Sequence, residues 1–378
     1  MEEKNQNNEL NQNKNQENAG DIQNEENYSF SRYKKPIKTG LKLIGESSYL
    51  NSVLFCLGNI RNIASYFLNP KNQSYINNNV GNNPLSYVFE RLLIHFYPYP
   101  EKENKEIYEP TSLLKIISSL NVEYKTLQKR SPNDLIVFIL NTLHEELNQN
   151  KNENLNLNEN IHDKKSVINN SLKKFKNSEN SIIYNNFNWF EIKELKCFDC
   201  NNTIYELRTF GTFSLNIQES YQKIKSQKNS ITLYDCLEYY KFTKQQKLYC
   251  NNCKCQKALN ITTNIFSSPN NFVFLLDRGK EFNDKNGSLK IPFVLCDKIE
   301  LDNFIENEKA PKKYQLIGIT SIYIKKKDYV SFGKSPVDQN WYYYNDETSN
   351  KLDINNIIQL HNNFKDFFPC ILIYKAVK

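Results

Sequence analysis

The stretch GLKLIGESSYLNSVLFCL, residues 40–57, decides the fold of this chain. It opens with a glycine-containing turn, and from Leu50 as far as Ile63 apolar side chains recur three or four residues apart. That spacing places them on one face of a helix. We therefore predict a helix that begins near Ser48 and lies in the hydrophobic core.

The composition is typical of a globular protein with polar attachments. The chain has 378 residues, of which 39% are hydrophobic and 13% aromatic, enough to build the core of one large domain or two ordinary ones. Its formal charge of +7 comes from 49 basic and 42 acidic side chains that are spread along the chain, so nucleic-acid binding is unsupported. Because neither a run of about 18 apolar residues nor a secretory signal occurs, we expect no membrane segment and a location in the cytoplasm, the nucleus or both.

Two segments are too polar to pack into a core. Residues 1–35 are rich in Asn, Gln and Glu, and we predict a disordered tail there. Residues 148–180 form a second Asn- and Lys-rich run, which we interpret as an exposed insertion because organised sequence resumes on both sides of it.

The remaining sequence predicts helices first and strands afterwards. A second helix is expected over 131–147, since Ser131 can cap it and Pro132 suits its first turn. Short runs of aromatic and β-branched residues, typical of strands, follow from about residue 181. The clearest of these runs lie at 181–192, 271–276, 314–324, 341–344 and 370–374. This order indicates an α+β domain.

The nine cysteines include two C-x-x-C pairs. Cys197 with Cys200, and Cys250 with Cys253, each place two thiolates on a tight turn, and together they predict a four-sulfur zinc site of the ribbon type. Four thiolates leave no position for water, so the zinc would be structural. Cys255 is a weaker candidate ligand, and two unrelated free-thiol turns are the alternative. The cysteines expected to be buried as small apolar side chains are Cys56, Cys236, Cys296 and Cys370.

Five motifs, in this order, resemble those of the ubiquitin-specific proteases, papain-like cysteine peptidases that remove ubiquitin from proteins. GLKLIGESSYLNS resembles the family's G-L-x-N-L-G-N-T-C-Y-M-N-S box, and SPNDLIVFIL with LHEEL resembles its Q-Q-D-A-x-E-F-L helix and the continuation of that helix. The C-x-x-C pairs are similar to those at the family's fingertips, and NNFVFLLDRG is similar to its strand ending in L-K-R-F. DYVSFGKSPVDQNWYYYNDET resembles the box G-H-Y-T-A-Y followed by W-Y-x-F-D-D-S.

The resemblance runs from about Gly40 to Tyr374 and implies a papain-like fold with fingers, palm and thumb and a zinc ribbon in the fingers. The family-like domain would span 36–378. Within it we expect the thumb at about 40–147, then the insertion, then fingers and palm at about 181–378.

The resemblance also shows where catalytic residues should lie, and most of those positions carry the wrong chemistry. The nucleophile position holds Ser48, whose hydroxyl needs a base, and the base position holds Asp328. An ordinary aspartate is a poor base for a hydroxyl, because a free aspartate has a pKa near 4. The oxyanion position holds Leu43, whose apolar side chain cannot donate a hydrogen bond to the oxyanion. Asn345 matches the third triad position, with Asp346 beside it. The chain's histidines, none of which lies in the base motif, are His95, His144, His162 and His361.

These replacements predict a catalytically inactive relative that binds ubiquitin, a ubiquitinated protein or another protein partner. Asp134 matches one of two family carboxylates that hold the tail of ubiquitin, while the other falls on Val137. Asp134 is equally well explained as a favourable acid in a first helical turn. Two alternatives stay open: an active deubiquitinating hydrolase, and an assembly scaffold that no longer binds ubiquitin, like the family's spliceosomal relative.

Overall fold

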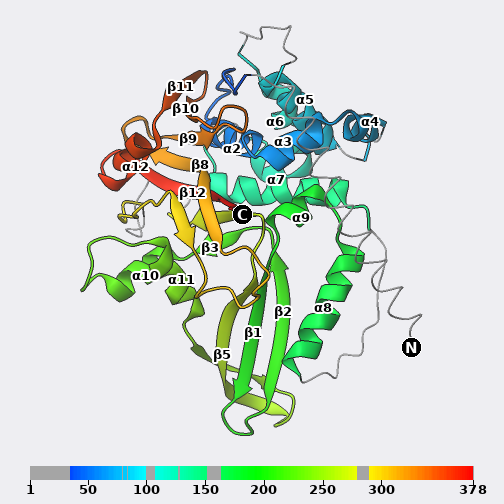
Figure 1. Cartoon of the computed structure of the whole chain (residues 1–378), viewed down its shortest axis with the longest axis vertical. Helices are drawn as coiled ribbons and strands as arrows, with labels where there is room; N and C mark the ends of the chain where they lie inside the picture. Colours follow the sequence, from blue (N-terminus) through cyan, green and yellow to red (C-terminus); the bar gives the residue numbers. More distant parts are fainter. Residues whose placement is uncertain are drawn as a thin grey trace.

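The computed structural model describes residues 35–78, 80–82, 84–98, 107–126, 128–150, 163–278 and 289–377. These residues form a helical lobe, a four-stranded sheet and an eight-stranded sheet (Figure 1). The α+β class predicted from the sequence is confirmed. The predicted tail lies outside the described residues except for Lys35.

The helical lobe surrounds α2 (Ser48–Gly58), every residue of which is buried. Phe55 of α2 stacks on Phe96 and on Tyr344, with ring centroids 5.4 and 4.4 Å apart, so α2 joins the helices to the large sheet. The other helices of this lobe are α3 (Arg61–Leu68), α4 (Pro70–Asn78), α5 (Pro84–Phe96), α6 (Thr111–Leu120), η1 (Val122–Tyr124), α7 (Pro132–Leu147) and α9 (Ile182–Phe187).

The apolar pattern that continues to Ile63 covers two helices instead of one. The backbone of Ile60 is extended, with φ −80° and ψ 110°, and α3 begins at the next residue. The pattern passes through this break because α2 and α3 bury their apolar faces in the same core. The helix predicted over 131–147 is confirmed as α7, and the hydroxyl of Ser131 accepts the backbone N–H of Asp134 at 3.3 Å.

The eight-stranded sheet has the order β11-β10-β9-β8-β12-β6-β3, with β7 paired to β8. It comprises β3 (Phe213–Leu215), β6 (Asn271–Leu276), β7 (Lys298–Glu300), β8 (Lys313–Tyr323), β9 (Asp328–Lys334), β10 (Trp341–Asn345), β11 (Thr348–Leu352) and β12 (Phe367–Ala376). On β6, Val273 and Leu275 join the core of the helical lobe, while Phe272 and Phe274 join a second core on the other face. Both faces of this sheet are therefore covered, and the strands predicted at 271–276, 314–324, 341–344 and 370–374 are confirmed.

The second core lies beneath α10 (Ile217–Ile224), α11 (Leu233–Lys241) and α12 (Ile354–Asn362). The four-stranded sheet extends away from it as long hairpins, which Figure 1 shows below the rest of the molecule. Its order is β2-β1-β5-β4, with β1 (Trp189–Cys197), β2 (Thr203–Phe210), β4 (Lys244–Cys250) and β5 (Cys255–Ser267).

One prediction for the segment between the thumb and this sheet was wrong. Residues 182–187 form the helix α9 instead of a strand, because the hydroxyl of Ser181 accepts the backbone N–H of Tyr184 and caps a helical turn. Part of the polar insertion is also ordered: α8 (Lys164–Ser178) lies along β2, and the ring of Phe175 is 5.7 Å from that of Phe190. None of the residues of α8 is buried, so this part of the insertion adds no side chain to a core. No helix among the described residues is long and apolar enough to cross a membrane.

Candidate functional site

Ser48 is the first residue of α2 and is fully buried. The turn before it is shaped by Gly45, whose φ of 59° suits glycine, and by the hydroxyl of Ser47, which accepts the N–H of Ile44 at 2.9 Å. The side chain that follows this turn is thereby directed toward the start of β9. Its position at the N-terminus of a buried helix agrees with the sequence prediction.

Asp328, the first residue of β9, lies against Ser48. Its carboxylate accepts hydrogen bonds from the Ser48 hydroxyl and from the N–H of Tyr329 at 3.1 Å. Lys129, from the loop before α7, places its ammonium 3.5 Å from the same carboxylate and also donates to the carbonyl of Lys327. The structure thus brings the two predicted positions together and adds a lysine that the sequence did not reveal.

Lys129 is itself held in place by the turn that precedes α2. Its backbone N–H donates to the Glu46 carboxylate at 3.0 Å. Through Lys129, the loop before α7 therefore contacts both the turn that precedes Ser48 and the start of β9. Among the described residues, the Ser48 hydroxyl donates to the Asp328 carboxylate and accepts from the backbone N–H of Tyr329 at 3.4 Å, and no imidazole contacts it.

Asn345 and Leu43 do not complete a catalytic arrangement. The side chain of Asn345 makes no hydrogen bond to another described residue, and its carbonyl accepts from Thr348 at 3.1 Å. The neighbouring Asp346 is the better placed acid: it accepts from Asn51 at 2.8 Å, and burial, followed by the nearby Asp328 charge, raises its pKa to about 6. Leu43, which matches the family's oxyanion position in sequence, is 41% exposed, and its apolar side chain offers no hydrogen-bond donor.

The described histidines are engaged elsewhere. His361 is fully buried between the Ser321 hydroxyl at 2.8 Å and the Ile357 carbonyl at 2.7 Å, and burial lowers its pKa to about 4. His144 lies 2.7 Å from Ser181 and 2.8 Å from Glu179.

His95 contacts the ring of Tyr108, and His162 lies outside the described residues. The thiol of Cys56, two turns along α2 from Ser48, is buried against Thr320. Burial raises the pKa of that thiol to about 12, so it stays protonated and unreactive.

Asp134 is exposed in the first turn of α7. This position is compatible with contact to the tail of ubiquitin and equally with a favourable acid at the start of a helix. Its neighbour Asn133 donates to the carbonyl of Leu276 at 3.1 Å. This bond fixes the start of α7 against the C-terminal end of β6. Val137, at the other acidic position, is partly buried and packs against the helical core.

The four predicted cysteine ligands meet at the far end of the four-stranded sheet. The sulfur atoms of Cys197, Cys200, Cys250 and Cys253 all lie within 4.8 Å of one another. Two of the separations, 3.9 Å for Cys197 to Cys253 and 3.6 Å for Cys200 to Cys250, bracket the roughly 3.8 Å between sulfurs of a tetrahedron with Zn–S bonds of about 2.3 Å. The four thiols could therefore hold a metal, whereas Cys255 is exposed and outside the cluster.

Comparisons with known proteins agree with this architecture. The family model described as "Ubiquitin carboxyl-terminal hydrolase" matches residues 39–374. Ubiquitin carboxyl-terminal hydrolase 4 of Saccharomyces cerevisiae (strain YJM789) is 25% identical over 358 residues, which cover 84% of this chain and 38% of that protein. Ubiquitin carboxyl-terminal hydrolase Usp2 of Drosophila melanogaster is 23% identical over 333 residues, covering 84% of this chain and 33% of that protein.

The chain therefore spans well under half the length of these curated relatives. Among solved structures, the SAGA Ubp8/Sgf11/Sus1/Sgf73 DUB module bound to ubiquitin aldehyde contains a chain of the same fold, with a TM-score of 0.64 and 17% identity over 92% of this chain and 71% of that one. The predicted fold with fingers, palm and thumb is confirmed. Because the family model spans nearly all of the globular part, this chain belongs to the ubiquitin carboxyl-terminal hydrolase family.

Proposed function

We propose that this chain is a catalytically inactive member of its family that binds ubiquitin or a ubiquitinated protein. The observation that carries the proposal is the pair formed by Ser48 and Asp328. In it the nucleophile position is a fully buried hydroxyl that donates to a carboxylate, and that carboxylate is already paired with Lys129.

The chemistry of acyl transfer explains why this pair argues against turnover. A serine hydroxyl becomes a useful nucleophile when a neighbouring base tuned near neutral pH takes its proton. Here the neighbour is a carboxylate engaged by an ammonium, and no described histidine reaches the hydroxyl. At the oxyanion position, loss of one hydrogen-bond donor typically costs about 10²- to 10³-fold in rate, and Leu43 provides none.

Binding requires less than catalysis. The scaffold retains the large sheet, α7 with Asp134 and the cysteine-tipped hairpins. One solved relative of the same fold is bound to ubiquitin aldehyde, and this supports ubiquitin as the partner. We further propose that the cysteine cluster holds one structural Zn²⁺, which would fix the ends of β1 and β4.

The test combines two assays on one sample. Isothermal calorimetry with ubiquitin measures binding, and a fluorogenic ubiquitin substrate measures cleavage. We expect binding without cleavage, with Asp134→Asn weakening the binding and the exposed Glu145→Gln on the same helix leaving it unchanged. Cleavage that Ser48→Ala abolishes would instead identify an active hydrolase. If ubiquitin does not bind, the proposal is wrong and an assembly scaffold that no longer binds ubiquitin becomes the better interpretation.

A further inference from the structure

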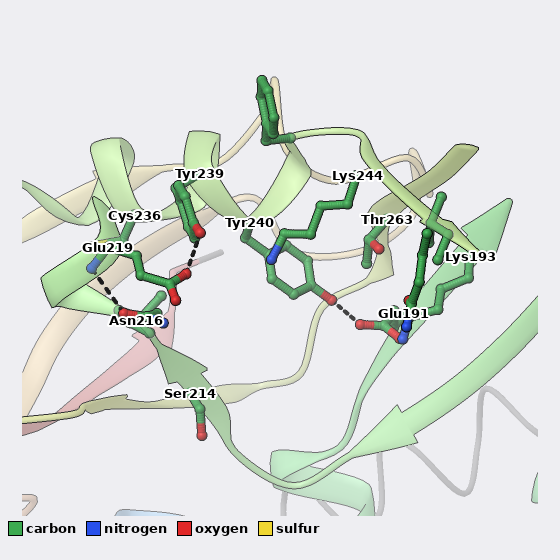
Figure 2. A pocket seen from close by; sticks show the side chains of 14 residues that line it. Glu191, Lys193, Ser214, Asn216, Glu219, Cys236, Tyr239, Tyr240, Lys244 and Thr263 are labelled. Carbon is green, nitrogen blue, oxygen red and sulfur yellow. Dashed lines mark hydrogen bonds and ion pairs between the residues drawn. The ribbon is translucent and has the colours of Figure 1, made fainter. Parts of the chain in front are cut away.

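A cavity of about 300 Å³ opens where the four-stranded sheet meets α10 and α11 (Figure 2). Its volume is at the lower end of the range for ligand pockets, about 300–1,000 Å³, which suits one large side chain or a small molecule. The residues that define its chemistry are Glu191, Lys193, Glu219, Tyr239, Tyr240 and Lys244. None of them belongs to the Ser48 region or to the cysteine cluster.

The most buried charged side chain that lines this cavity is a carboxylate. Glu191 is only 5% exposed, and its Oε2 atom accepts a hydrogen bond from the hydroxyl of Tyr240. Its Oε1 atom is buried without a hydrogen-bond partner, although the ammonium of Lys193 lies 3.3 Å away. Figure 2 shows this carboxylate beside the ring of Tyr240 at the cavity wall. A buried carboxylate oxygen that lacks a hydrogen bond is an acceptor for an incoming donor.

The walls of the cavity also favour a cation. The hydroxyl of Tyr239 donates to Glu219, as that of Tyr240 donates to Glu191. Because both hydroxyl protons point at carboxylates, the tyrosines offer an incoming ligand only acceptor oxygens and ring faces. The chain's own ammonium groups already lie over rings here: Lys244 is 5.2 Å from the Tyr239 centroid. Lys244 is exposed and the side chain of Lys193 is 26% exposed, so both lysines can turn toward solvent and admit another cation.

The C-terminal end of β6 links one residue of the cavity lining to the start of α7. Leu215 lines the cavity and pairs with Leu276 in the β3–β6 ladder. The carbonyl of Leu276 accepts from Asn133, which directly precedes Asp134. The C-terminal end of β6 therefore pairs with a residue that lines the cavity and also accepts a hydrogen bond from the residue that precedes Asp134.

We propose that this cavity receives an arginine side chain of the protein partner proposed above. The guanidinium would donate to Oε1 of Glu191, displace Lys193 and lie against the ring of Tyr240. Its planar fork of donors matches a carboxylate, and its delocalised charge stacks on aromatic faces better than an ammonium does. The identity of the partner rests on the proposed function, whereas the chemistry of the cavity does not.

The first experiment uses a small probe and no ubiquitin. Saturation-transfer difference NMR follows binding of N-acetyl-arginine amide, with N-acetyl-norleucine amide as the uncharged control. We expect a dissociation constant on the order of 1 mM for the arginine probe and no detectable binding of the control.

Variants of the cavity then separate a binding role from damage to the fold. Glu191→Gln should weaken the arginine probe about tenfold, as expected for a lost charge-assisted hydrogen bond. Lys193→Ala should strengthen it, because the competing ammonium is gone. Glu194→Gln, on the opposite face of β1, should change nothing. No binding of the arginine probe to wild type, or equal binding to wild type and Glu191→Gln, would overturn the proposal.

Ubiquitin calorimetry on the same variants tests the partner. A tenfold loss in Glu191→Gln, with Glu194→Gln unchanged, would support an arginine of ubiquitin as the occupant. If ubiquitin binds both variants as it binds wild type, the cavity does not belong to the ubiquitin-binding face and that part of the proposal is wrong. If wild type binds the arginine probe but not ubiquitin, the proposed function fails and the cavity chemistry stands.

Discussion

Replacing Ser48 by alanine should cost this protein stability instead of activity. The Ser48 hydroxyl is fully buried and donates to Asp328, whose side chain is 21% exposed. A hydrogen bond to a charged group contributes about 1.5–3 kcal/mol, and its loss leaves part of the carboxylate unsatisfied. We therefore expect Ser48→Ala to lower the free energy of unfolding by about 1.5–3 kcal/mol.

A double-mutant cycle in urea isolates this contribution. Ser48→Ala, Asp328→Ala and the double variant are unfolded in parallel, and the coupling energy should be about 1.5 kcal/mol or more. Lys129→Ala serves as the control for the outer, partly exposed ion pair and should cost less, about 1 kcal/mol or below.

Two results would refute the reasoning. If Ser48→Ala unfolds at the same urea concentration as wild type or a higher one, the hydroxyl is not part of the packed structure. Residues kept for catalysis often show this behaviour, because active sites sacrifice stability for function. If Ser48→Ala lowers ubiquitin cleavage without lowering the free energy of unfolding, the hydroxyl serves catalysis and not the packed structure.

Three further outcomes follow from the structure. Metal analysis should find one zinc per chain, lost in Cys200→Ser and retained in Cys255→Ser. The pKa of His361 is lowered to about 4 in the folded state, so between about pH 6.5 and pH 4 only the unfolded state takes up its proton. The free energy of unfolding of wild type should therefore fall by up to about 3 kcal/mol relative to that of His361→Gln as the pH falls from 6.5 to 4. Gly40→Ala, whose Cβ would lie 2.2 Å from a backbone oxygen in the β10–β11 turn, should cost about 1–3 kcal/mol in urea unfolding, and Gly81→Ala, with open space around it, should cost far less.

The elements that the sequence predicted well are those with local signals. The start of α7 is specified by Ser131 and Pro132. In β6, the residues from Phe272 to Leu276 form a continuous apolar run because the sheet is covered on both faces. The C-x-x-C spacing identified the cysteine cluster, because two such turns at the ends of hairpins bring four sulfurs together.

The failures have an equally physical origin. The β-branched and aromatic residues of α9, which are Ile182, Ile183, Tyr184 and Phe187, suit a strand. The hydroxyl of Ser181 caps this segment and favours the helix. Lys129 carried no motif, and its place beside Asp328 depends on how the loop before α7 packs against two distant segments. Glu191 and Tyr240 are 49 positions apart, so their shared cavity appears only in the folded chain.

The residues at the predicted catalytic positions are consistent with one another, and this supports the proposed loss of catalysis more strongly than any single replacement does. A thiolate at position 48 would face the Asp328 carboxylate, and repulsion between the two negative charges would raise the pKa of the thiol. Serine avoids that conflict because its neutral hydroxyl donates to the carboxylate, and Lys129 balances the remaining charge. If the chain is inactive as we propose, restoring a cysteine alone would leave its thiol beside a carboxylate instead of an imidazole, and we expect no cleavage from Ser48→Cys.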